Sequence, residues 1–82
     1  MKAIAYTRTA ATALRKHANK AKRIMGKIEQ YAANPAAQAN HVVALKGSDY
    51  LRLRVGDFRV IFAETADAIT VIDIGPRGGI YQ

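Results

Sequence analysis

Three arginines lie within one short, regularly patterned stretch of the chain. Arg52 and Arg54 alternate with apolar residues in segment 51–55, and Arg59 does the same in segment 58–62. Because side chains two apart on a strand share a face, Arg52 and Arg54 are expected to project together, with Arg59 on the neighbouring strand. A planar guanidinium can bind two oxygen atoms at once. Three of them on a rigid sheet therefore suit a phosphate group.

The apolar pattern around these arginines predicts a β-hairpin. Period-two alternation on both sides of Gly56-Asp57 is typical of strands that are half-buried on one face. The Gly-Asp pair fits the turn, although Asn-Gly or Asp-Gly would be a stronger turn signal. Taken alone, Arg52 and Arg54 are better explained as the solvent-exposed face of an amphipathic strand.

The first half of the chain predicts a strand followed by helices. Residues 2–7 suit a short strand with Ile4 and Tyr6 inward, and residues 9–33 have a helical pattern. The apolar positions of that pattern are Leu14, Ala18, Ala21, Met25, Ile28 and Ala32. Thr7 or Thr9 is expected to cap the start, and Asn34-Pro35 to end the section. Asn19 and Gly26 weaken the helical pattern, which favours two helices packed as a hairpin.

The second half predicts strands separated by short turns. Residues 36–41 form a connection, and 42–45 are either a short strand or an extended lead-in. Turns at 46–49 and 64–67 flank the hairpin, a strand follows at 68–74, and 75–79 is a loop. We therefore expect one α+β domain over residues 1–82. It has an N-terminal strand, a helical hairpin and then a three-to-four-stranded antiparallel sheet.

Composition limits the class of protein. Half of the 82 residues are hydrophobic, which is typical of a globular chain, and there is no cysteine to form a disulfide or a thiolate metal site. His41 has no second histidine nearby at ligand spacing, so neither a metal nor another cofactor is expected. No apolar run approaches the roughly 20 residues that cross a bilayer. We expect a cytoplasmic protein that does not contact a membrane.

The net charge of +7 is concentrated near the N-terminus, where eight basic residues precede the first acidic residue, Glu29. Such one-signed clustering favours a surface that binds a polyanion over a merely solvated helix face. A transit peptide would have the same sign, but its removal would leave too little apolar surface to cover the sheet. The basic residues expected to contact RNA in this region are Lys20, Lys22, Arg23 and Lys27.

Three pieces of the chain together resemble the RelE/ParE superfamily of bacterial type II toxins. They are segments 45–47, 50–62 and 74–81, and the order of the predicted elements agrees as well. The resemblance implies a curved antiparallel sheet with a helical hairpin on one side. RelE-like members are ribosome-dependent endoribonucleases that cut mRNA in the decoding site, so it also implies metal-independent RNA cleavage.

The resemblance assigns roles to particular residues. By position, Arg52, Arg54 and Arg59 match basic residues on the central strands, Arg77 matches a later arginine, and Tyr81 matches a tyrosine near the C-terminus. The implied catalytic residues are Arg54, Arg59, Arg77 and Tyr81. Arg52 and Lys46 join the RNA-binding residues.

Tyr81 is expected either to transfer a proton or to stack on a base. The chain departs from the motif of the family at three positions. Pro76, Gly78 and Gly79 stand where many members have histidine, arginine and glutamate.

The function implied is that of a toxin that cuts mRNA on the ribosome, inhibits translation and arrests growth. Its partners would be the ribosome, mRNA and a cognate antitoxin that lays an acidic segment across the basic cleft. Two alternatives remain open at this point. One is a ParE-like poison of DNA gyrase that binds protein and cuts no RNA, and the other is a catalytically degenerate toxin that only binds its antitoxin.

Overall fold

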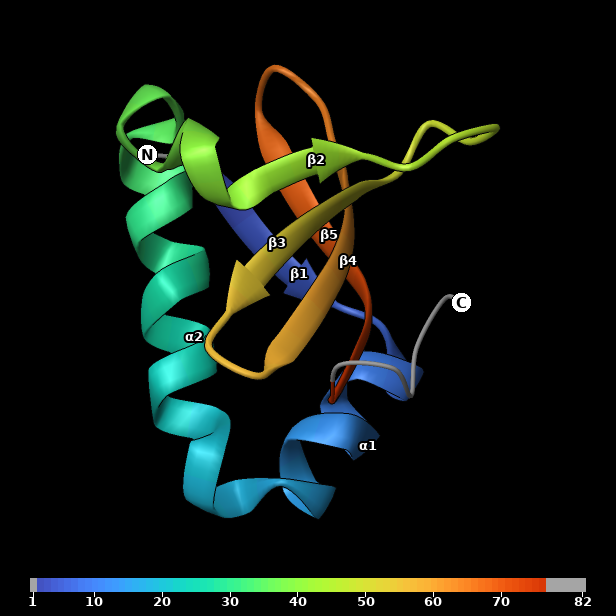
Figure 1. Cartoon of the computed structure of the whole chain (residues 1–82). Coiled ribbons are helices and arrows are strands. Elements are labelled where there is room, and N and C mark those ends of the chain that lie inside the picture. The colour runs from blue at the N-terminus through green and yellow to red at the C-terminus, as the bar shows by residue number, and fades with distance from the viewer. Residues whose placement is uncertain (1, 77–82) are drawn as a thin grey trace.

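A computed structural model describes residues 2–76 and contains one mixed β-sheet with two α-helices (Figure 1). The sheet has the strand order β1-β5-β4-β3-β2; β1 is parallel to β5, and every other pair is antiparallel. The strands are β1 (Ala3–Tyr6), β2 (Val42–Ala44), β3 (Leu51–Val55), β4 (Phe58–Glu64) and β5 (Ala68–Pro76). The predicted α+β class is confirmed: four antiparallel strands follow the helices, and the N-terminal strand adds a fifth.

The helical section divides into α1 (Arg8–Lys16) and α2 (Ala18–Ala33). Thr7 caps α1, because its hydroxyl oxygen accepts a hydrogen bond from the Ala10 amide at 3.1 Å. The same hydroxyl donates to the Ile72 carbonyl at 2.7 Å, which ties the start of the helix to β5. A pair of helices was predicted correctly, but the break lies at His17 rather than at Asn19 or Gly26.

The connection predicted after α2 is a 3-10 helix, η1 (Pro35–His41). Asn34 ends α2 because the residue before a proline avoids the α region. Its side-chain oxygen then accepts from the Ala37 amide at 3.4 Å and starts η1. His41, the last residue of η1, is thereby placed immediately before β2.

The core lies between the helices and one face of the sheet. Its buried side chains are Ala10, Ile24, Ile28, Tyr31, Ala32, Leu53, Val55, Val60, Phe62, Ile69, Val71 and Ile74. On α2 the buried stripe differs from the prediction, since Ala18 is exposed and Met25 is only half-buried. The reason is the break at His17, which ends the helical period of α1 and lets α2 begin in a new direction. No helix within residues 2–76 is long and apolar enough to cross a membrane.

Strand β5 is longer than predicted. Gly75 and Pro76 were expected in a loop, but they continue the strand and pair with Arg59 and Phe58 of β4. Proline is tolerated there because β1 pairs with β5 only as far as Val71, so β5 is an edge strand on that side at Pro76. Gly56 at the β3–β4 turn has a φ of 57°, a left-handed conformation that glycine adopts without strain. The predicted turn at Gly56-Asp57 is therefore confirmed.

A polar network fastens the start of the chain to α2 and the end of β4. The Lys2 ammonium forms an ion pair with Glu64, and the Tyr31 hydroxyl donates to the other carboxylate oxygen at 2.6 Å. Burial, followed by this hydrogen bond, raises the pKa of Tyr31 far above its usual value. Burial also acts to raise the pKa of Glu64, but the hydrogen bonds from Lys2 and Tyr31 outweigh it and lower that pKa.

Candidate anion-binding cleft

The three strand arginines project from the sheet face opposite the helices. Strand alternation buries Leu53 and Val55 in the core and turns Arg52 and Arg54 outward, as predicted. In the β3–β4 register, Arg54 lies directly opposite Arg59. Directly opposed residues have Cβ atoms about 5 Å apart, and like charges at that spacing repel each other. The fold therefore holds two like charges close together, an arrangement that suits a bound anion.

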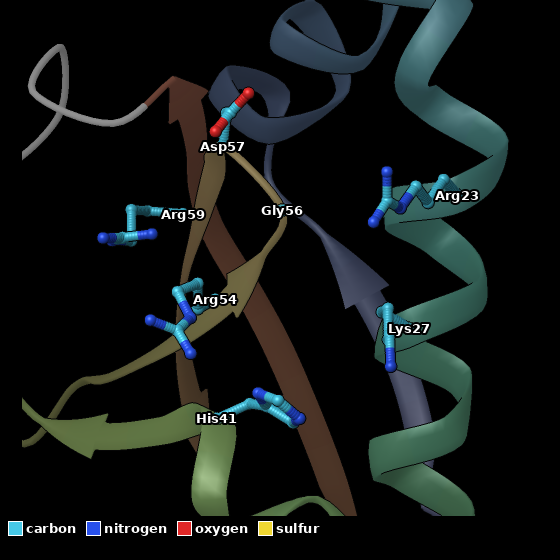
Figure 2. A pocket seen from close by; sticks show the side chains of 7 residues that line it. All are labelled: Arg23, Lys27, His41, Arg54, Gly56, Asp57 and Arg59. Carbon is cyan, nitrogen blue, oxygen red and sulfur yellow. The ribbon is translucent and has the colours of Figure 1, made fainter.

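A cavity of about 500 Å³ is lined by residues of both this hairpin and α2. It is lined by Arg23, Lys27, His41, Arg54, Gly56, Asp57 and Arg59. Figure 2 shows Arg23 and Lys27 on α2 across a gap from Arg54, with His41 beside the gap; Arg59 lies farther from α2 in this view. The structure thus brings together four basic residues that the sequence singled out, two from the helix and two from the sheet.

The helical period that buries the core residues of α2 also sets the positions of its two cavity-lining cations. Ile24 and Ile28 are buried, so the residues that precede each of them, Arg23 and Lys27, lie at the edge of the buried stripe. Arg23 reaches the β3–β4 turn closely: a Cβ added at Gly56 would lie 3.4 Å from its Nη2 atom. We call Arg23 and Lys27 the helix wall of the cavity, and Arg54 and Arg59 its sheet wall.

Two residues of the cavity were not assigned a functional role from the sequence. His41 was read as a loop residue and Asp57 as a turn residue, but both line the cavity. The pairing of β2 with β3 explains His41: Val42 lies opposite Leu53, so one further step brings position 41 to Arg54. Histidine is the side chain that most often serves in general acid–base catalysis, so His41 adds a candidate for proton transfer to the site.

A second, smaller hollow of about 120 Å³ adjoins the cavity and shares three of its residues. It is lined by Asn40, His41, Val43, Arg52, Arg54 and Arg59. Arg52 therefore faces this hollow rather than the cavity. Within residues 2–76, no group of three or more His, Asp or Glu side chains comes together that could hold a metal ion.

The remaining predicted site residues are placed differently. Lys20 lines a hollow with Arg23 and Phe58 beside the cavity. Lys22 lies on another side of α2, near Met25 and Gly26, and Lys46 is exposed in the turn after β2. The structure does not bring these two lysines to the cavity. Arg77 and Tyr81 lie outside the described residues.

His17 makes a structural contact rather than lining the cavity. Its ring meets Phe58 edge to face, with centroids 4.9 Å apart and planes at 75°. Since His17 separates α1 from α2 and Phe58 begins β4, this contact connects the bend between the helices to the hairpin that carries the arginines. The contact helps to fix the distance between the two walls of the cavity.

Comparison with known structures supports the fold. The RelE–RelB complex from Pyrococcus horikoshii OT3 is similar with a TM-score of 0.76 at 22% identity, over 95% of this chain and 97% of that one. The E. coli DinJ–YafQ complex is similar with a TM-score of 0.74 at 16% identity, over 99% of this chain and 98% of that one. RelB–RelE from Methanococcus jannaschii gives 0.71 at 26% identity, over 94% of both chains. A search of curated protein sequences found no match.

The sequence itself decides the family. Residues 4–81 match the family model described as the ParE toxin of the type II toxin–antitoxin system parDE. That range covers nearly the whole chain and contains every element described above except the first residue of β1. The chain therefore belongs to the ParE toxin family within the RelE/ParE superfamily, and it is a toxin of a type II toxin–antitoxin pair.

Proposed function

We propose that this toxin is a metal-independent endoribonuclease that cuts mRNA on the ribosome. The observation that supports this most is the set of four cations that line one cavity, Arg23 and Lys27 from α2 and Arg54 and Arg59 from the hairpin. Cations on two sides of a groove suit a flexible polyanion that runs between them, such as the backbone of single-stranded RNA. The one acidic residue among the described lining residues, Asp57, leaves the charge of the cavity strongly positive.

RNA cleavage without a metal needs the 2′-oxygen held in line with the phosphate, and charge stabilisation on the pentacoordinate phosphorus. Arg54 and Arg59 meet the second need through charge-assisted hydrogen bonds from fixed positions. Arg23 and Lys27 of the helix wall would help to hold the 2′-oxygen in line with the phosphate. Correct positioning alone is worth several orders of magnitude in rate. Arginine stays charged in proteins, so proton transfer falls to His41, with Tyr81 as the second group.

The experiment that tests this is primer extension on cellular mRNA after induced expression of the toxin. Cuts inside translated codons, with growth arrest, support the nuclease. Uncut mRNA in arrested cells contradicts it. Cells that grow normally while the folded toxin accumulates would instead indicate a degenerate toxin that only binds its antitoxin.

A second candidate is a poison of DNA gyrase. The match to the ParE toxin family favours it, whereas the relatives named above carry RelE and YafQ names. The same cells decide between the two: linearised plasmid and blocked supercoiling with intact mRNA support the gyrase target. A gyrase poison also predicts that the cavity arginines can be replaced without restoring growth, since no phosphate need be bound there.

The partner we propose is a cognate antitoxin with an acidic segment that fills the cleft. The similar RelE and YafQ structures were solved as complexes with RelB and DinJ. A segment rich in Asp and Glu would neutralise both walls and block RNA. Competition between the purified antitoxin and labelled RNA for the toxin tests this; simultaneous binding of both would contradict it.

A further inference from the structure

We propose that the smaller hollow beside the cavity is a subsite for one nucleobase, with Val43 as its stacking surface and Asn40 as the residue that selects the base. This inference rests on the proposed RNA substrate and adds to it a source of sequence preference. Val43 is 51% exposed, the exposed large hydrophobic residue of segment 2–76. A single exposed valine is ordinary on a protein surface, but this one lines a hollow together with Arg52, Arg54 and Arg59.

The surroundings of Val43 suit a base. Its partner in the β2–β3 register is Arg52, on the same face of the sheet. Guanidinium planes and apolar side chains are the surfaces on which unpaired RNA bases stack. Pockets for drug-sized ligands measure about 300–1,000 Å³, so a hollow of about 120 Å³ has room for one planar ring system.

The cationic cavity and the smaller hollow adjoin each other, as the phosphate and the base of one nucleotide do. Arg54, Arg59 and His41 line both of them. A phosphate held by the arginines in the cavity therefore leaves the attached base next to Val43. Asn40, at the end of η1, contributes an amide with both a donor and an acceptor, the combination that pairs with the edge of adenine.

The test compares uncleavable 2′-O-methyl oligonucleotides with an abasic backbone of the same length, by fluorescence anisotropy on the purified toxin. Both carry the same phosphates, so their difference measures base stacking. The native toxin should bind the base-containing strand at least about fivefold more tightly. Val43→Ser should remove most of that difference, and Val43→Leu, which keeps the apolar surface, should retain it. Equal affinity of the native toxin for both strands overturns the proposal.

Asn40 is tested with the same probes carrying adenine or uracil. Asn40→Ala should reduce any preference between the two bases to within about twofold and leave the abasic affinity unchanged. Asn19→Ala, an exposed position on α2 away from both hollows, is the matched control. An unchanged preference in Asn40→Ala overturns its role. If mRNA is cleaved in cells but the purified toxin shows no base-dependent affinity, the base subsite is wrong and the nuclease proposal still holds.

Discussion

At the scale of single residues, the site combines two arginines of like charge with a histidine. Arg54 and Arg59 are opposed across the hairpin, and His41 lies between the sheet and the helix. Like charges directly opposite each other on neighbouring strands repel, and a bound anion would offset that repulsion. We expect the site to lower the stability of the free toxin, and single substitutions can measure by how much.

Replacing Arg54 by glutamine is expected to stabilise the free protein and weaken the toxin. Removing one of two opposed charges should gain about 0.2–1 kcal/mol, seen as a melting temperature a few degrees higher. Growth arrest should decrease at the same time. Arg15→Gln, an exposed position on α1, serves as the charge-matched control. A lower melting temperature for Arg54→Gln would show that the opposed pair is not strained.

Replacing His41 by asparagine should separate binding from cleavage. Asparagine keeps a hydrogen-bonding side chain but cannot transfer a proton near neutral pH. General acid–base groups typically contribute about 10²–10⁴-fold in rate, so the cleavage rate should fall by that order while RNA affinity stays within a few-fold. Single-turnover cleavage and anisotropy measure the two quantities. An unchanged rate would leave Tyr81 as the proton-transfer group.

At the scale of elements, neighbouring positions of α2 contribute to both the core and the cavity. Ile24 and Ile28 pack in the core, and Arg23 and Lys27 form the helix wall. The His17–Phe58 contact and the Lys2–Glu64–Tyr31 network attach the two ends of α2 to the sheet. The width of the cavity therefore depends on how firmly α2 is held.

The double variant Arg23→Gln, Lys27→Gln tests the helix wall. It removes two charges from one side of the cavity and leaves the core untouched, so the melting temperature should stay the same or rise. RNA affinity and growth arrest should both fall. Lys16→Gln, exposed at the end of α1, removes a charge away from the cavity and should leave both unchanged. Equal losses in the control would mean that net charge, not position, governs binding.

The network around Glu64 predicts a particular dependence of stability on pH. Because the pKa of Glu64 is lowered in the folded protein, the unfolded chain binds more protons at acid pH. This contribution is complete above the unfolded pKa of a glutamate and is lost as the pH falls through the folded value. Glu64→Gln should cost about 1–3 kcal/mol at neutral pH and flatten the acid limb of the denaturation curve. Asp49→Asn, in the exposed turn, should change neither.

At the scale of the whole molecule, a net charge of +7 attracts any polyanion, and the fold decides where it binds. Part of the charge lines the cavity, and part, such as Lys22 and Lys46, faces solvent elsewhere. A domain this small has a total stability of only about 4–12 kcal/mol by its length. Its few core contacts therefore have to hold a strongly repulsive surface in place.

The affinity of the toxin for single-stranded RNA should fall steeply with salt. Each phosphate neutralised contributes a slope of about −0.7 in a plot of log affinity against log salt. Two walls that each hold a phosphate predict a slope of about −1.4 or steeper. Titrations between low and physiological salt measure it. A slope near zero would show that the cavity does not bind the RNA backbone.

Much of this structure followed from local pattern. Alternation placed Arg52, Arg54 and Arg59 on the outer face of the hairpin, Gly56-Asp57 gave the turn, and Thr7 capped α1, because each depends on residues close in sequence. The break at His17 and the extension of β5 to Pro76 were missed, since both depend on pairing and packing with distant segments. Antiparallel register also placed His41 next to Arg54, which no local pattern could reveal.

The amino-acid sequence by itself determined the α+β class, the family and the cations available for an anion. Periodicity and composition act within a few residues, so they specify which side chains share a strand or helix face. Only the tertiary structure decided which cations meet: it set Arg23 and Lys27 across from Arg54 and Arg59 and left Lys22 and Lys46 outside. The reason is that the direction of α2 after His17 and the register of β2 on β3 arise from burial of the whole core.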